Sequence, residues 1–114
     1  MVLDELQKRR VSNTLEKFCN ERIPKEIKNQ IKLDFSIRGN HVTLFEKRRY
    51  FKDPSQWTKC KIAQFRYDSD GSKWSLYWWR HTGKWYKYLD IDAKNNLQDL
   101  LDEVDKDPTG IFWG

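Results

Sequence analysis

The sequence contains few of the residues that build disulfide scaffolds, metal sites and flexible linkers. Among its 114 residues are two cysteines, two histidines, three prolines and five glycines. Cys19 and Cys60 form no CxxC pair, and two scattered histidines complete no zinc ligand set. We therefore expect both cysteines to be reduced thiols, and we expect no metal and no other cofactor.

Long apolar runs are also absent. No stretch approaches the roughly 18 apolar residues of a transmembrane helix, and residues 1–10 lack the apolar segment of a signal peptide. The sequence contains no glycine-rich phosphate loop, Ser-His-Asp set or HExxH motif. These absences favour a cytoplasmic, non-catalytic protein with no membrane partner, folded as a single domain over residues 1–114.

Charge is abundant and unevenly distributed. Lys and Arg number 22 against 17 Asp and Glu, which gives a net charge of +5. Residues 1–90 hold 20 basic against 11 acidic residues, whereas residues 91–114 hold 2 against 6. A basic segment such as residues 1–90 is typical of proteins that bind an anionic partner such as nucleic acid. It is equally typical of a solvated surface that keeps a small protein in solution.

Helical spacing predicts one helix near each end of the chain. Asp4 and Gln7 have the spacing of a capping box that would begin a helix over residues 5–20. The apolar stripe predicted for this helix consists of Leu6, Val11, Leu15, Phe18 and Cys19. A second helix over residues 96–106 would end at Asp107-Pro108 and bury Leu97, Leu100, Leu101 and Val104.

Alternation of apolar and polar residues predicts five strands between these helices. Their expected ranges are 31–38, 42–46, 58–67, 73–80 and 84–89. Residues 47–57 are expected to form a basic, aromatic connection, and the expected tight turns include Gly39-Asn40 and Thr82-Gly83. We predict an α+β fold with an N-terminal helix, a five-stranded antiparallel meander, a C-terminal helix and a docked apolar tail at residues 111–113.

The later strands are rich in aromatic residues, with seven rings among the 15 positions from 74 to 88. Alternation assigns to the core face Ala63, Phe65, Tyr67, Trp74, Leu76, Trp78, Trp85 and Leu89. The second face would carry Ile62, Gln64, Arg66, Ser75, Tyr77, Trp79, Tyr86 and Tyr88. Such a face suits a stacking platform for nucleic acid. It suits also a face that is covered by a second helix, by another protein or by a second copy of the chain.

Basic and aromatic residues interleave over residues 47–61, which suits either a nucleic-acid contact or a solvated strand edge. The predicted nucleic-acid or partner surface therefore consists of Arg48, Arg49, Lys52, Lys61, Arg66, Tyr77, Trp79, Tyr86 and Tyr88. No catalytic residue is predicted.

Glu46 is the candidate for a buried polar residue. A two-residue turn at Gly39-Asn40 would place it opposite Leu33, on the apolar side of the hairpin. We expect a buried carboxylate there, paired with an arginine such as Arg66 or Arg80. Asp34 would point to the opposite face, so the two carboxylates cannot share a metal as in a metal-dependent nuclease.

Several segments in order resemble domain-of-unknown-function family 3024, a family of short bacterial proteins. They are residues 42–46, 57–58, 62–63, 65–67, 74–78 and the closing 107–114. The chain departs from the family pattern at Trp79 and at the basic run 47–49. The resemblance implies a small bacterial protein and carries no activity. We expect a binding module that favours nucleic acid; the alternative is a structural protein-interaction or homodimerisation domain that uses its aromatic face.

Overall fold

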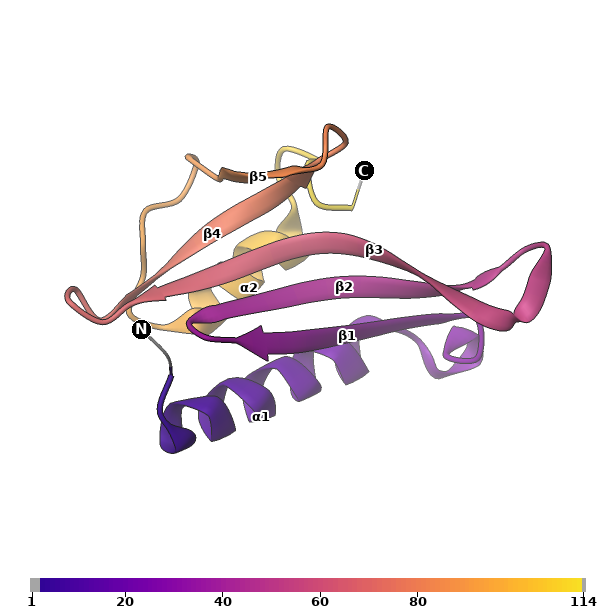
Figure 1. Cartoon of the computed structure of the whole chain (residues 1–114), viewed down its shortest axis with the longest axis horizontal. Helices are drawn as coiled ribbons and strands as arrows, with labels where there is room; N and C mark the ends of the chain where they lie inside the picture. Colours follow the sequence, from indigo (N-terminus) through magenta and orange to yellow (C-terminus); the bar gives the residue numbers. More distant parts are fainter. Residues whose placement is uncertain (1–2, 114) are drawn as a thin grey trace.

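The computed structural model describes residues 3–113, and a single antiparallel sheet organises them. Its strands follow the chain in the order β1 (Ile31–Arg38), β2 (His41–Tyr50), β3 (Asp53–Asp68), β4 (Lys73–Arg80) and β5 (Lys84–Lys87) (Figure 1). Helix α1 (Glu5–Arg22), the 3₁₀ turn η1 (Lys25–Ile27) and helix α2 (Leu97–Lys106) flank the sheet. The predicted α+β meander is confirmed.

Helix α1 begins at the predicted capping box, in which Asp4 accepts a hydrogen bond from the backbone N–H of Gln7 and the Gln7 side chain bonds back. Val11 is among its buried residues, but Leu6 is 57% exposed and does not belong to the stripe. Val11 follows Leu6 by five positions, which at about 100° per residue places the two side chains about 140° apart around the helix. Leu3, which precedes the helix, is buried instead.

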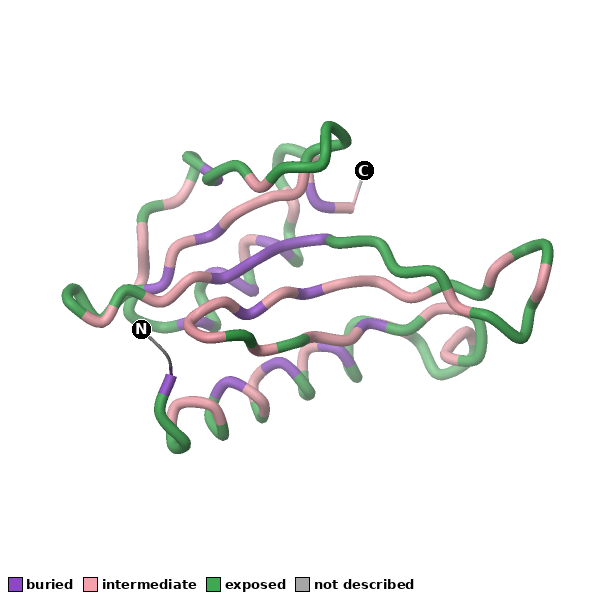
Figure 2. The backbone as a smooth tube through the Cα atoms, in the orientation of Figure 1, coloured by how far each residue is buried: buried purple, intermediate pink, exposed green. Residues whose placement is uncertain are grey.

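Both helices contribute to one hydrophobic core on one face of the sheet. The core contains the predicted apolar residues of α2 together with sheet residues such as Val42, Leu44 and Phe65. In Figure 1, α2 lies behind the sheet and α1 runs beside β1, and Figure 2 shows the buried segments concentrated in the middle of the strands and along the helices. Neither helix within residues 3–113 is long and apolar enough to cross a membrane.

The C-terminal tail docks on this core, as predicted. Phe112 is buried, and its ring lies 5.1 Å from that of Tyr88. The Trp113 indole N–H donates to the carbonyl oxygen of Val104 at 2.7 Å, and the Arg22 guanidinium lies 4.7 Å from the Trp113 ring. The tail thus contacts α2, the end of α1 and Tyr88, which follows β5. Gly114 lies outside the described residues.

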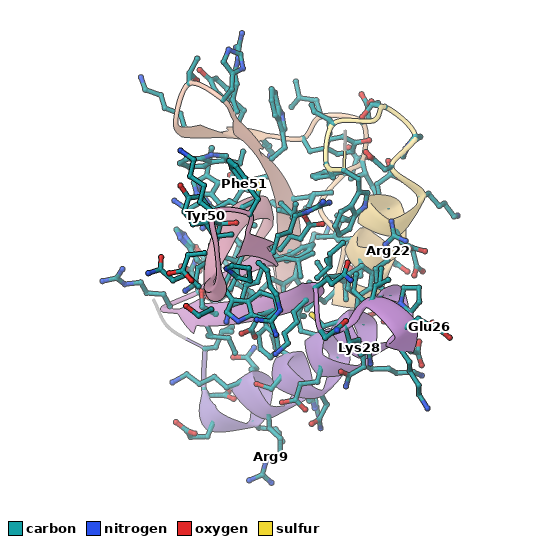
Figure 3. The ribbon with its side chains drawn as sticks, turned by 90° about the vertical axis from the view of Figure 1, so that its right-hand side faces the viewer. Arg9, Arg22, Glu26, Lys28, Tyr50 and Phe51 are labelled. Carbon is teal, nitrogen blue, oxygen red and sulfur yellow. The ribbon has the colours of Figure 1, made fainter. Side chains whose placement is uncertain are left out.

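Residues 47–57 form no separate connection, and that prediction is wrong. β2 continues to Tyr50 and β3 begins at Asp53, so the segment is the end of a long hairpin. Figure 3 looks onto this end, with Tyr50 and Phe51 at its tip. Arg49 stabilises the extension because its side chain donates to the carbonyl oxygens of Asn29 and Pro54. Asp53-Pro54 therefore starts a strand, and the turn lies just before it.

The side chains of β5 point to the opposite faces of the sheet from those predicted. The expected two-residue turn at Thr82-Gly83 would pair residue 81 with residue 84, but the loop has three residues and Arg80 pairs with Lys84. The backbone N–H of Gly83, at φ +87°, donates to Arg80. This shift by one residue places Trp85 opposite Trp79 and leaves Leu89 82% exposed.

Candidate functional site

The candidate site is the face of the sheet that the helices do not cover, which we call the open face. Strand pairing places on it nine basic side chains: Lys32, Arg38, Lys47, Arg49, Lys59, Lys61, Arg66, Lys73 and Lys87. It also carries five aromatic side chains: Phe45, Trp57, Tyr77, Trp79 and Trp85. Asp34 and Asp68 are the acidic residues among these paired positions. Nine basic and two acidic groups leave a net +7, against +5 for the whole chain.

A bulge in β3 determines which lysines reach this face. The register between β2 and β3 shifts after Leu44, which pairs with Ala63, so that Phe45 pairs with Lys61 and Ile62 has no partner on β2. Ile62 is buried in the core together with Ala63. Without the extra residue, Lys61 would share the core face of Ala63. The bulge therefore moves Lys59 and Lys61 to the open face.

Cations lie directly over the aromatic rings of the open face. The Lys61 ammonium is 4.0 Å from the ring centre of Trp79, and the Arg66 guanidinium is 3.9 Å from that of Tyr77. Trp79 also packs edge-on against Trp85, with ring centres 5.1 Å apart. These cation–π contacts keep positive charges and aromatic rings together on one face, and such a combination can contact both the phosphates and the bases of a nucleic acid.

Three lysines form a row across adjacent strands. Lys32 pairs with Lys47, and Lys47 pairs with Lys59, so three ammonium groups lie on neighbouring strands of one face. Like charges directly opposite each other in a sheet are destabilising. Asp34 compensates in part through an ion pair with Lys47 at 3.1 Å. The remaining repulsion would be relieved by an anion bound above the row.

A hollow of about 360 Å³ lies beside this row. Its basic lining consists of Arg38, Lys59 and Lys61, and its aromatic lining of Phe45 and Trp85. The remaining lining residues are polar: Ser36, His41, Thr43 and Gln64. Gln64 is buried and held in place, because its amide donates to the hydroxyl of Thr43 at 3.0 Å and accepts from the Arg66 guanidinium at 2.7 Å. The hollow thus has a fixed polar floor and a basic wall.

His41 lies between two arginines, since it pairs with Arg38 on β1 and with Arg66 on β3. Desolvation by burial and, to a smaller degree, the positive charge of Arg66 lower the pKa of His41 below its usual value. The imidazole is therefore held neutral near pH 7. An anion bound beside it would reverse the electrostatic contribution and favour the protonated form.

The structure gathers part of the predicted surface on the open face. Five predicted residues lie there: Arg49, Lys61, Arg66, Tyr77 and Trp79. The predicted placement of Tyr86 and Tyr88 on this face is wrong. The three-residue loop before β5 shifts the strand by one residue, so its side chains point to the opposite faces. Tyr86 pairs with Trp78, and Tyr88 is buried with its hydroxyl donating to Glu103 at 2.9 Å. Ile62, also predicted on this face, is in the core because of the bulge.

Two other predicted residues lie off the open face. Arg48 points to the helix side of the sheet, and Lys52 belongs to the turn between β2 and β3. The predicted set omitted basic residues that reach the open face, among them Lys32 and Lys47. The polar half of the alternation in β1 carries Lys32, so this signal was present in the sequence.

Glu46 lies on the helix side, opposite Leu33, as the hairpin register predicted. The predicted partner of Glu46, Arg66 or Arg80, is wrong. Glu46 instead forms an ion pair with Arg48, two residues along the same strand. The Glu46 side chain is 14% exposed, so it is partly buried rather than buried, and that of its partner Arg48 is 61% exposed and reaches the surface. Asp34 and Glu46 point to opposite faces, as predicted. Within residues 3–113 no three His, Cys, Asp or Glu side chains gather closely enough to hold a metal ion.

Comparison with protein families gives a match over nearly the whole chain. The family described as Domain of unknown function (DUF3024) matches residues 3–114. The chain belongs to this family. Comparisons with curated proteins and with solved structures gave no match. Membership in DUF3024 therefore agrees with the resemblance in the sequence, and any functional argument must come from the open face itself.

Proposed function

We propose that this protein is a non-catalytic module that binds nucleic acid on the open face of its sheet. The observation that carries the proposal is the charge of this face, which holds nine basic and two acidic side chains interleaved with five aromatic rings. Lys and Arg neutralise phosphates and release condensed counterions, which supplies most of the affinity of sequence-independent binding. Rings beside such cations stack on bases.

Self-association through the same face is the rival function, and the charge distribution opposes it. A two-fold dimer would bring identical patches together. Each patch has an excess of seven positive charges, so the two copies would repel each other at this interface. The positive charge of the face is better suited to an anionic partner than to a second copy of the chain.

The test is binding of fluorescein-labelled oligonucleotides of random sequence, followed by fluorescence anisotropy from 50 to 300 mM salt. We expect the logarithm of the affinity to fall linearly with the logarithm of salt concentration, by roughly 0.7 to 0.9 per phosphate neutralised. The variants Lys59→Ala and Lys61→Ala should each weaken binding and reduce this slope by about one phosphate.

The control variant is Arg9→Ala, which removes the same charge from a different surface. Arg9 is exposed on α1, and Figure 3 shows it pointing away from the sheet. Its loss should leave affinity and salt slope unchanged if the open face is the site. An equal loss in all three variants would show that only net charge matters, and absence of binding at 50 mM salt would reject the proposed function.

A further inference from the structure

We infer that the open face binds single-stranded nucleic acid in preference to duplex, with one unstacked base held in the hollow beside Trp85. This inference rests on the proposed function and adds the class of nucleic acid and the place of a base. The hollow is lined by Lys59, Lys61 and Arg38 on its basic side and by Phe45 and Trp85 on its aromatic side.

The width of the sheet argues against a duplex. Neighbouring strands lie roughly 4.8 Å apart, so five strands span about 19 Å between the outermost backbones. The major groove of B-DNA is about 12 Å wide and admits an α-helix or a two-stranded ribbon. The basic and aromatic side chains of the open face come from all five strands, from Lys32 on β1 to Lys87 on β5. A groove could accommodate only a part of this surface at a time.

The orientation of the rings gives a second argument. Phe45 lies in the middle of β2, and Trp79 and Trp85 pair with each other beside the loop that joins β4 to β5. All three are strand residues on the open face, and none of them is at a protruding loop tip that could wedge into a base stack. In a duplex the flat faces of the bases are covered by their neighbours. A base can stack on a protein ring only when the strand is single and the base is splayed out.

The residues that line the hollow match the chemical parts of one nucleotide. The volume of the hollow, about 360 Å³, lies in the range of small-molecule sites. The Thr43 hydroxyl and the Gln64 amide, fixed by their mutual hydrogen bond, offer polar groups at the floor for the edge of a base. Lys59 and Lys61 lie two residues apart on one face of β3, so their ammonium groups can follow successive phosphates of a strand.

The experiment compares a labelled 20-nucleotide single strand with the duplex of the same sequence, both at 100 mM salt. We expect the single strand to bind at least ten-fold more tightly. Equal or tighter binding of the duplex would overturn the inference and leave the proposed function standing. No binding of either form, at this salt or at 50 mM, would reject both.

Two adjacent residues provide a matched pair of variants. Trp85 faces the hollow, whereas Tyr86, the next residue of β5, pairs with Trp78 on the helix side of the sheet. Trp85→Ala should weaken single-strand binding by roughly five- to 160-fold, the range for loss of one base–ring stack. Tyr86→Ala should change it less than two-fold. Equal effects of the two variants would contradict the placement of the base.

A third variant keeps the inference testable if Trp85→Ala disturbs the fold. Trp85→Phe retains a ring that can stack on a base and should keep most of the single-strand affinity, with a thermal melt close to that of the unaltered protein. The loss in Trp85→Ala should also be confined to the single strand. A similar loss for duplex would indicate damage to the sheet and would overturn the stacking assignment.

Discussion

Asp107 allows a quantitative test of how the C-terminal tail is held. It caps α2 in the left-handed conformation, with φ +45°, and its two carboxylate oxygens accept hydrogen bonds from the backbone N–H groups of Phe112 and Trp113 at 3.1 and 3.0 Å. One side chain therefore ends the helix and turns the tail onto the core. We compare the variants Asp107→Ala, Asp107→Gly and Asp107→Asn.

The expected losses in the free energy of unfolding follow from these two functions. A hydrogen bond to a charged acceptor contributes roughly 1.5–3 kcal/mol, and partial exposure puts these two at the lower end, so their loss costs about 3 kcal/mol together. Alanine in the left-handed region adds about 1 kcal/mol, which glycine avoids. Asp107→Ala should thus cost about 4 kcal/mol and Asp107→Gly about 3. Asp107→Asn should cost about 2 kcal/mol, because asparagine tolerates this conformation but keeps only one acceptor oxygen, which carries no charge.

Thermal denaturation followed by circular dichroism measures the difference. For a domain of this size, 1 kcal/mol corresponds to roughly 4 °C in Tm. The expected order of Tm is wild type, then asparagine, then glycine, then alanine, with alanine about 16 °C below wild type. A melt of Asp107→Ala within 2 °C of wild type would show that the Asp107 hydrogen bonds contribute little to holding the tail. Equal values for glycine and alanine would refute the conformational part of the argument.

Three further predictions concern individual titratable groups. Glu46→Ala should cost about 1 kcal/mol or less by thermal melt, since its ion pair with Arg48 reaches the surface; a loss above 3 kcal/mol would mean that the carboxylate is buried. Because the folded state lowers the pKa of His41, the unfolded state binds the proton more readily, so stability should fall as pH decreases below about 6.5. The variant His41→Gln should lose less stability at low pH than the wild type, and a pH profile of stability identical to that of the wild type would contradict the role of His41. Burial raises the pKa of Cys19 to about 12 whereas Cys60 is exposed, so a thiol reagent at pH 8 should label one cysteine rapidly; two equal rapid phases would refute this.

Local patterns predicted most of the fold, because they depend on neighbours in the chain. The capping box at Asp4, the alternation in β1 and the turn at Gly39-Asn40 each involve residues within a few positions of one another. That turn correctly placed Glu46 opposite Leu33 and Asp34 on the other face. The apolar spacing in α2 was likewise sufficient to predict its buried stripe.

The candidate site was harder to predict because a single inserted residue changes which way a strand faces. The bulge at Ile62 moves Lys59 and Lys61 to the open face, and the third loop residue before β5 moves Trp85 there and removes Tyr86. Both positions have sequences that fit either register. The choice between them is made by packing, since Ile62 and Tyr88 are buried against the helices and the tail.

The sequence by itself therefore determined the number and order of the elements, the basic character of the chain and its membership in a family over residues 3–114. Only the tertiary structure decided that both helices cover the same face and that an excess of seven positive charges gathers on the other. The physical reason is that a charge count is a property of composition. The face on which each charge lies depends on strand register, and register is fixed by contacts between residues distant in the chain.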